Sequence, residues 1–187
     1  MSEVEKEYRY KIDDNIVENI KRIATVIEEE QNQVDLTLGY AGFESLYKYG
    51  YVCRVRRKGK KIWLEIKNRQ EDGSFIETKI YINDFSDGVK LFQAIGMKPY
   101  MYMERKREIL KYNNLKIFID DVELLGKYVE IEFQDEQNKE NIENFTKMVN
   151  IDSEKQPLYG DIIINKIKED ESFNKEYNRR LNEFINF

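Results

Sequence analysis

The sequence predicts an α+β fold built around an antiparallel β-barrel. Eight segments of the chain alternate between apolar and charged residues with the two-residue period of strands. Turn-forming residues separate these alternating segments at short intervals. With 187 residues, 41% of them hydrophobic, the chain can bury one compact core but is shorter than chains whose cores usually divide. We therefore expect a single domain over residues 1–187.

The strand pattern recurs along the whole chain. It covers Glu3–Ile12, Val34–Leu38, Tyr49–Arg57, Lys61–Lys67, Phe75–Ile82, Tyr100–Tyr112, Leu115–Asp120 and Lys127–Phe133. A meander is the simplest connection for the middle strands. Asn113 and Asn114 separate two of these segments, and asparagine tolerates the positive φ that a tight hairpin turn requires. We expect a hairpin there.

Helical periodicity accounts for the remaining segments. One stripe follows a cap at Asp13 or Asp14 and consists of Ile16, Val17, Ile20, Ile23, Ala24 and Ile27. A second helix is predicted over Ser86–Ile95, with Gly96 as its stop. Three C-terminal helices are predicted over Lys139–Asn150, Tyr159–Ile167 and Ser172–Phe187, where they are expected to flank the barrel.

Composition narrows the possible functions. A formal net charge of -5 argues against binding to nucleic acid or to an anionic membrane. The chain has no histidine, and Cys53 is its only cysteine, so a metal site would be built from oxygen ligands, which suit Mg²⁺, Ca²⁺ or Mn²⁺. No signal peptide or membrane-spanning run is evident, so we expect a cytoplasmic protein.

The polar faces of the predicted strands are unusually orderly. Residues of one parity are Glu5, Glu7, Arg9 and Lys11; Arg54 and Arg56; Glu65 and Lys67; Glu77 and Lys79; Arg105 and Arg107; and Glu130 and Glu132. One interpretation is a solvated outer face with cross-strand ion pairs. The other is a charged barrel interior, in which basic residues meet phosphate oxygens and carboxylates hold a bridging metal. Recurrence in strand after strand favours the interior.

The two kinds of charge are chemically complementary in such a site. Arginine forks neutralise phosphate oxygens bidentately, and lysine adds point charge. Carboxylates would repel a triphosphate unless a divalent cation lay between them. The sequence has no Walker loop, no Gly-x-Gly-x-x-Gly and no nucleophile elbow. The more familiar nucleotide-binding folds therefore lose support.

Several motifs resemble the CYTH superfamily, also called triphosphate tunnel metalloenzymes, over roughly residues 3 to 165. The similar motifs are the acidic and basic N-terminal strand, the spacing of Leu46, Gly50, Arg54 and Arg56, the Leu64-Glu65-Ile66-Lys67 strand, and the segment 119–132, IDDVELLGKYVEIE. The last is the most specific. The sequence of this segment, together with Gly-Met-Lys-Pro and Glu-Arg-Lys-Arg-Glu, is most similar to the class IV adenylyl cyclase-like branch.

The resemblance implies a closed tunnel of eight antiparallel strands with a charged interior. It implies triphosphate binding by Arg9, Lys11, Arg54, Arg56, Lys67, Arg105 and Arg107. It implies binding of Mg²⁺ or Mn²⁺ by Glu5, Glu7, Asp120, Glu130 and Glu132. We assign catalysis to Arg9 and Lys11. Arg9 replaces the family's usual lysine, and arginine does not readily release a proton.

Several functions are consistent with this pattern. The leading hypothesis is a class IV adenylyl cyclase-like enzyme that converts ATP to cyclic AMP and pyrophosphate. The direct alternative is an inorganic triphosphatase or thiamine triphosphatase that releases orthophosphate. A noncatalytic module that binds nucleotide or polyphosphate is a third hypothesis, and a homodimer is compatible with the apolar helix faces. Trp63 shares parity with Glu65, so it could stack on a base or thiazole or pack at the barrel rim.

Overall fold

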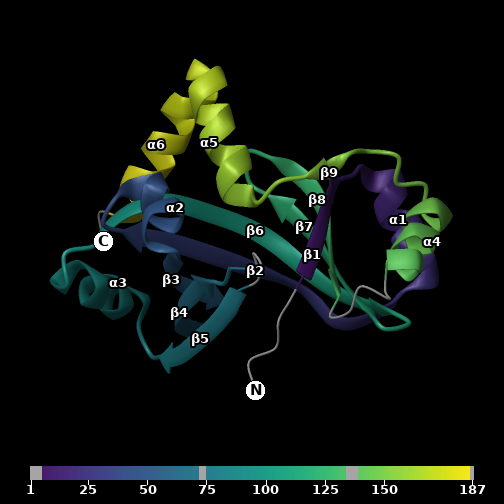
Figure 1. Ribbon diagram of the computed structural model, residues 1–187, viewed down its shortest axis with the longest axis horizontal. Coiled ribbons are helices and arrows are strands. Elements are labelled where there is room, and N and C mark those ends of the chain that lie inside the picture. Colours follow the sequence, from purple (N-terminus) through teal and green to yellow (C-terminus); the bar gives the residue numbers. More distant parts are fainter. Residues whose placement is uncertain (1–5, 72–74, 134–138, 186–187) are drawn as a thin grey trace. The chain divides into compact units, whose positions relative to one another are not determined.

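The computed structural model of the protein describes residues 6–71, 75–133 and 139–185 (Figure 1). The strands are β1 (Lys6–Lys11), β2 (Thr25–Gly39), β3 (Tyr51–Lys58), β4 (Lys61–Arg69), β5 (Phe75–Ile82), β6 (Lys98–Tyr112), β7 (Leu115–Val122), β8 (Gly126–Phe133) and β9 (Lys155–Gln156). The helices are α1 (Asp14–Ile23), a 3-10 turn at Gly42–Glu44, α2 (Ser45–Tyr49), α3 (Phe85–Ala94), α4 (Lys139–Met148), α5 (Tyr159–Glu169) and α6 (Glu171–Ile185).

The strands form one sheet in the order β5-β4-β3-β2-β6-β7-β8-β1-β9. The assigned pairings are antiparallel, so the predicted α+β class is correct. The predicted closed barrel of eight strands differs from this sheet. A ninth strand, β9, pairs with β1 through Lys155 and Gln156, and hydrogen bonds among the described residues do not join the ends of the sheet.

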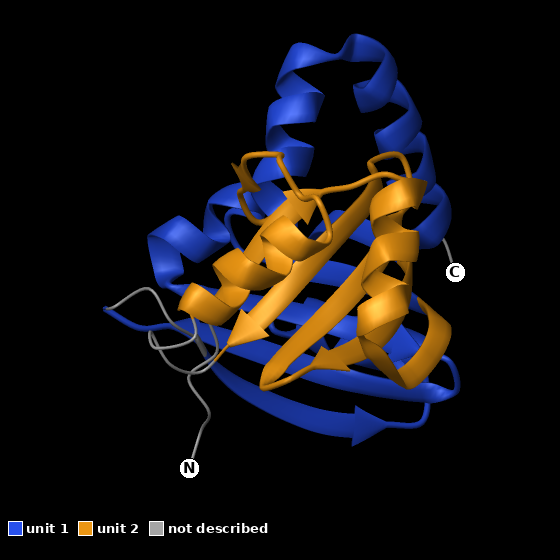
Figure 2. Ribbon diagram, turned by 90° about the vertical axis from the view of Figure 1, so that its right-hand side faces the viewer, with its two compact units in different colours: residues 1–2, 33–104, 159–187 blue, residues 3–32, 105–158 orange. Residues whose placement is uncertain are grey.

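The chain divides into two compact units, coloured in Figure 2. Unit 1 consists of residues 1–2, 33–104 and 159–187, and unit 2 of residues 3–32 and 105–158. Each unit therefore combines segments that are distant in sequence. Each also contains strands of the sheet with one apolar face and one charged face.

In unit 2, strands β7, β8 and β1 and the end of β6 present an apolar face to helices α1 and α4. Ile20 of α1 and Phe145 of α4 are completely buried in this core, together with Leu110, Ile117 and Ile131 of the sheet. The alternation of side chains along each strand then directs the residues of the other parity to the opposite face. That opposite face carries the charged residues.

Unit 1 has the same organisation. Leu36, Val55 and Leu64 of neighbouring strands pack with Val89 of α3, and Phe184 of α6 packs against the same core. Gly88 of α3 permits this close approach, because a Cβ there would lie 2.6 Å from the Cδ1 atom of Ile82. The charged residues of β3 and β4 again occupy the other face.

Local turn chemistry matches the sequence prediction at two connections. Asn113 adopts φ 52, and Tyr112 pairs with Leu115 across the two-residue turn, as the asparagine pair predicted. Gly96 adopts φ 87 after α3, and the amide of Met97 returns to the carbonyl of Phe92. Both turns therefore rest on residues that accept positive φ.

Several predicted boundaries were wrong, including the start of the second strand, which was predicted at Val34 and lies at Thr25. The first helix ends at Ile23, and Ile27, assigned to its apolar stripe, lies in β2 and is exposed. The run Thr25-Val26-Ile27 is β-branched, which favours a strand. Tyr49, predicted to begin a strand, ends the short helix α2, because Gly50 takes the left-handed conformation that closes it.

The three predicted C-terminal helices are present as α4, α5 and α6. Asp170 begins α6 by accepting a hydrogen bond from the amide of Phe173 at 2.9 Å. Within the described ranges, every helix is too short or too polar to cross a membrane.

Candidate functional site

The charged face of unit 1 is organised around a buried fork between Asp35 and Arg56. The two residues are directly opposite each other in the pairing of β2 with β3. The Arg56 guanidinium donates through Nε to Oδ1 at 2.5 Å and through Nη2 to Oδ2 at 2.6 Å. Asp35 is 2% exposed, so this bidentate contact holds the guanidinium in one orientation.

Glu65 of β4 extends this network to a second arginine. Its carboxylate forms an ion pair with Arg54, accepts a hydrogen bond from the Trp63 indole at 3.0 Å and lies 3.5 Å from Nη1 of Arg56. Burial acts to raise the pKa of Glu65, but the guanidinium groups of Arg54 and Arg56 outweigh it and lower the pKa to about 2. Glu65 is therefore ionised at neutral pH.

Lys67, Glu77 and Lys79 continue the charged face toward β5. Glu77 forms ion pairs with both lysines, and its Oε2 lies 2.5 Å from Nζ of Lys79. Burial opposes ionisation of Glu77, but Lys67 lowers its pKa overall. These groups are more accessible than the arginine network, with Lys67 24% exposed.

The charged face of unit 2 contains a fork of the same geometry. Arg107 and Asp120 are directly opposite each other in the pairing of β6 with β7. Arg107 donates through Nε and Nη2 to the two oxygens of Asp120, both at 2.6 Å. Nη1 of Arg105 lies 3.6 Å from the same carboxylate, and Asp120 is completely buried.

Glu130 of β8 connects this fork to β1. It accepts from Arg107 through one oxygen and from Arg9 through the other, including Nε of Arg9 at 3.0 Å. Arg9 also donates to Glu7 at 2.7 Å and to the carbonyl of Pro157 at 2.6 Å. Burial acts to raise the pKa of Glu130, but Arg107 and Arg9 hold that pKa well below its usual range.

The remaining predicted site residues are more accessible than these buried networks or lie outside the described residues. Lys11 is exposed at the end of β1. Glu132 forms an ion pair with Lys116 at 3.2 Å, and this pair is partly accessible. Glu5 lies outside the described residues.

The Asp–Arg forks determine what each face can do chemically. A guanidinium that donates through Nε and one Nη is fixed in a plane before any ligand arrives, so little side-chain entropy is lost when a phosphate binds. Buried arginines also interact more strongly with an anion than exposed ones. Each face therefore offers preoriented cationic groups suited to oxyanions.

A divalent metal fits these residues in ligand type but not as a ready coordination shell. The carboxylates Glu7, Asp120 and Glu130 supply the oxygen donors that Mg²⁺ and Mn²⁺ prefer. Their described oxygens, however, face the guanidinium groups of Arg9 and Arg107. Among the residues that the structure describes, no three acidic or cysteine side chains gather as a metal site.

Asp35 is the main functional candidate that sequence reasoning missed. The sequence indicated that Asp35 lies on the polar face of its strand, because its neighbours Val34 and Leu36 are apolar and pack in the core. Aspartate is also depleted in strands, so a buried one requires a partner. The register that places it opposite Arg56 came only from the structure.

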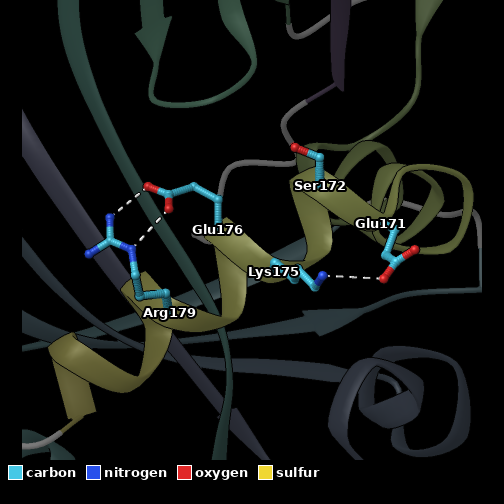
Figure 3. A pocket seen from close by; sticks show the side chains of 5 residues that line it. All are labelled: Glu171, Ser172, Lys175, Glu176 and Arg179. Carbon is cyan, nitrogen blue, oxygen red and sulfur yellow. Dashed lines mark hydrogen bonds and ion pairs between the residues drawn. The ribbon is translucent and has the colours of Figure 1, made fainter.

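A shallow hollow on α6 is unrelated to these faces. Figure 3 shows its lining residues, Glu171, Ser172, Lys175, Glu176 and Arg179, which all belong to that one helix. Lys175 pairs with Glu171, and Arg179 pairs with Glu176, so the hollow is a solvated helix surface with local ion pairs.

In each unit, one face of the sheet packs against helices and the other carries buried arginine–carboxylate pairs, an arrangement suited to binding anionic ligands. The chain belongs to the CYTH domain family, whose match spans residues 3–162. That span includes every predicted site residue and most of both compact units.

Known relatives agree with this assignment. "Putative adenylate cyclase MJ0240" of Methanocaldococcus jannaschii is 25% identical over 147 residues, which is 69% of this chain and 76% of the relative. A conserved hypothetical protein from Pyrococcus furiosus has a similar structure, with a TM-score of 0.72 and 24% identity over 84% of this chain and 98% of that one.

A further solved structure has a similar fold. "Putative adenylyl cyclase HpAC1" from Hippeastrum, described as having a dominant triphosphatase activity, has a TM-score of 0.64 and 16% identity. The alignment covers 88% of this chain and 95% of that one. At this identity the likeness establishes a shared fold only.

Proposed function

We propose that this protein is a divalent-metal-dependent enzyme that acts on small triphosphates, with ATP as the leading substrate and cyclic AMP and pyrophosphate as products. The observation that carries the proposal is the pair of buried Asp–Arg forks, Asp35 with Arg56 and Asp120 with Arg107. Membership of the CYTH family supports the choice of a triphosphate as the anion. We further propose that residues 1–187 act as one domain, since the family match includes segments of both units.

In this proposal the arginines bind and orient the triphosphate. On the charged face of unit 1, Arg54 and Arg56 neutralise phosphate oxygens, and on the charged face of unit 2, Arg9, Arg105 and Arg107 are suited to the same role. Asp35 and Asp120 act as positioning residues that keep Arg56 and Arg107 in plane. Fixed cationic groups stabilise charge that develops on the leaving phosphate without reorganising during the reaction.

Carboxylates of unit 2 would hold the metal in this proposal. Glu7, Asp120 and Glu130 are the described candidates, with Glu132 at the accessible edge and Glu5 preceding β1. A bound Mg²⁺ or Mn²⁺ would lower the charge of the reacting phosphoryl group. Arg9 does not readily release a proton, so we assign it to binding and charge neutralisation, with Lys11 at the exposed end of the same strand.

The cyclase reaction joins the ribose 3′-oxygen to the α-phosphorus and breaks the bond between that phosphorus and the bridging oxygen of pyrophosphate. The hydroxyl proton passes to water, and pyrophosphate leaves. The name of the relative from Methanocaldococcus jannaschii supports this reaction. The triphosphatase activity named for the Hippeastrum protein favours a second candidate, in which water attacks the terminal phosphorus and orthophosphate leaves.

The test is to incubate the purified protein with Mg²⁺ or Mn²⁺ and with ATP, inorganic tripolyphosphate or thiamine triphosphate. Cyclic AMP, pyrophosphate and orthophosphate are then resolved. Cyclic AMP with an equal amount of pyrophosphate supports the cyclase. Release of the terminal phosphate as orthophosphate identifies the protein as a triphosphate hydrolase. Tight binding without turnover of any substrate identifies a noncatalytic binding module and overturns the enzymatic proposal.

Two adjacent arginines of β3 provide a matched pair of variants. Arg56 lies in the buried fork, whereas Arg57 is exposed, has the opposite parity and contacts the Phe85 ring. Arg56→Lys keeps the charge but removes the bidentate geometry, so we expect kcat/KM to fall at least about tenfold. Arg57→Lys should leave kcat/KM unchanged. Equal kcat/KM in both variants would show that the bidentate contact between Asp35 and Arg56 is not required for activity.

Glu130→Gln tests the metal assignment. It keeps the size of the side chain and removes the charge that would attract a divalent cation. We expect turnover to fall and the metal concentration needed for half-maximal activity to rise. Unchanged turnover, with folding verified by circular dichroism, would show that the catalytic-metal assignment of Glu130 is wrong.

A further inference from the structure

An aromatic pair lies directly beside the arginines on the charged face of unit 1. Trp63 pairs with Arg56 on one side and with Tyr81 on the other, in the register of β3, β4 and β5. The Trp63 and Tyr81 rings are 6.0 Å apart with an interplanar angle of 53°. The guanidinium carbon of Arg56 lies 5.8 Å from the Trp63 ring.

The two rings differ in exposure and in their hydrogen bonds. Trp63 is 9% exposed, and its indole N–H is fixed by the carboxylate of Glu65. Tyr81 is 68% exposed, the highest value among the large apolar and aromatic side chains that lie at the surface of the described residues. An exposed ring beside a fixed one, on a face otherwise made of charged groups, is a suitable surface for a planar ligand to stack on.

The order of side chains along the strands gives this face a direction. From the aromatic pair, the next residues on the same face of β4 and β5 are Glu65 and Lys79, and then Lys67 and Glu77. These positions lie about 7 Å apart, since a strand rises about 3.4 Å per residue. The cations of this face are Arg56 beside the aromatic pair and then Arg54, Lys79 and Lys67, so a polyanion attached to a planar ring on the pair would extend along them.

Resting on the proposed function, we propose that Trp63 and Tyr81 recognise a neutral heteroaromatic ring attached to the triphosphate, so that this site selects a nucleoside triphosphate over inorganic tripolyphosphate. The ring stacks on the exposed face of Tyr81, beside the fixed edge of Trp63. Arg56 already occupies the cation position at the Trp63 ring, which disfavours a cationic ring such as thiazolium.

The experiment compares affinities for ATP, inorganic tripolyphosphate and thiamine triphosphate by isothermal titration calorimetry, with and without Mg²⁺. The variants are Tyr81→Ala, Tyr81→Phe and Trp63→Phe. Ile80→Ala is the control, because Ile80 neighbours Tyr81 on the same strand, has the opposite parity and is also exposed. Thermal unfolding of each variant reports any structural loss.

We expect Tyr81→Ala to weaken ATP binding roughly ten- to hundredfold, the range in which base–aromatic stacking contributes. Its affinity for tripolyphosphate should be unchanged. Tyr81→Phe keeps a ring and should bind ATP like the unsubstituted protein. Trp63→Phe should lose part of the preference for ATP over tripolyphosphate. Ile80→Ala should match the unsubstituted protein for every ligand.

Five outcomes would overturn the inference. Equal losses for ATP and tripolyphosphate in Tyr81→Ala would assign the residue to general binding. Lower stability with an unchanged affinity ratio would make the pair a cross-strand packing contact only. A loss confined to thiamine triphosphate would contradict the neutral ring. If the unsubstituted protein binds none of the three ligands, with or without Mg²⁺, the proposed function falls and this inference with it. If that protein binds tripolyphosphate as tightly as ATP, only the inference falls.

Discussion

Replacing Glu65 with glutamine tests the charge network of unit 1 directly. The Glu65 side chain is completely buried between two arginines, and its pKa is lowered from 4.5 to about 2. A pKa difference of that size corresponds to about 3 kcal/mol in favour of the carboxylate in the folded protein. Glutamine retains an oxygen that can accept the Trp63 indole hydrogen bond. We therefore expect Glu65→Gln to lower the free energy of unfolding by about 3 kcal/mol at pH 7.

The pH dependence of this loss follows from the direction of the shift. Because the folded pKa is depressed, the unfolded chain takes up the proton first as pH falls. The stabilisation from Glu65 is fully present above pH 4.5 and is lost as pH falls through about 2. At pH 3, about 2 kcal/mol of the contribution should already be gone. The difference in the free energy of unfolding between the unsubstituted protein and Glu65→Gln should therefore become smaller in acid.

Urea denaturation between pH 7 and pH 3 measures this difference in the free energy of unfolding, with Trp63, the only tryptophan, as the fluorescent probe. Glu183→Gln on α6 is the control, since Glu183 is 62% exposed in its ion pair with Arg179 and should contribute less than about 1 kcal/mol. A gap that stays constant with pH would show that packing, not charge, causes the loss. No gap at pH 7 would refute the argument from the pKa.

Three further changes probe packing and turns. Tyr177→Phe removes a hydroxyl that accepts from the Tyr102 amide at 2.9 Å and donates to its carbonyl at 2.7 Å, so thermal or urea unfolding should show a loss of about 1–3 kcal/mol. Gly88→Ala would place a Cβ 2.6 Å from Ile82, and overpacking should lower stability by about 1–3 kcal/mol in the same assay. Asn113→Val forces a β-branched residue to φ 52, and a loss below about 1 kcal/mol would contradict the strain argument.

Much of the fold could be predicted because strand periodicity is a local signal. The parity of Val34 and Leu36 against Asp35, for example, is visible in five consecutive residues. Element boundaries were less certain where two propensities compete, as at Ile27, which fits a helical stripe by spacing but lies in a β-branched run. The strand β9 has only two residues and is defined by its pairing with β1, so no periodic pattern could reveal it.

The candidate site shows the same division between local and nonlocal information. Parity placed Arg54 and Arg56 on one charged face, and Arg105 and Arg107 on another. Parity could not say which carboxylate each arginine would contact, because that depends on the register between strands. Glu132 illustrates the point: it shares the parity of Glu130, but it forms an ion pair with Lys116, whereas Glu130 contacts Arg9 and Arg107. Glu5 lies outside the described residues, so its assignment stays a prediction.

The energetics of burial favour a functional origin for these networks. Buried ion pairs often stabilise a protein no more than apolar residues of similar volume, because desolvation offsets the attraction between the charges. Stability alone therefore does not explain why Arg107, Asp120 and Glu130 share one buried face. A site that must accept a polyanion does need cations, and the carboxylates keep those cations paired and oriented when no ligand is bound. Apolar replacement of the whole network should then preserve folding and abolish triphosphate binding.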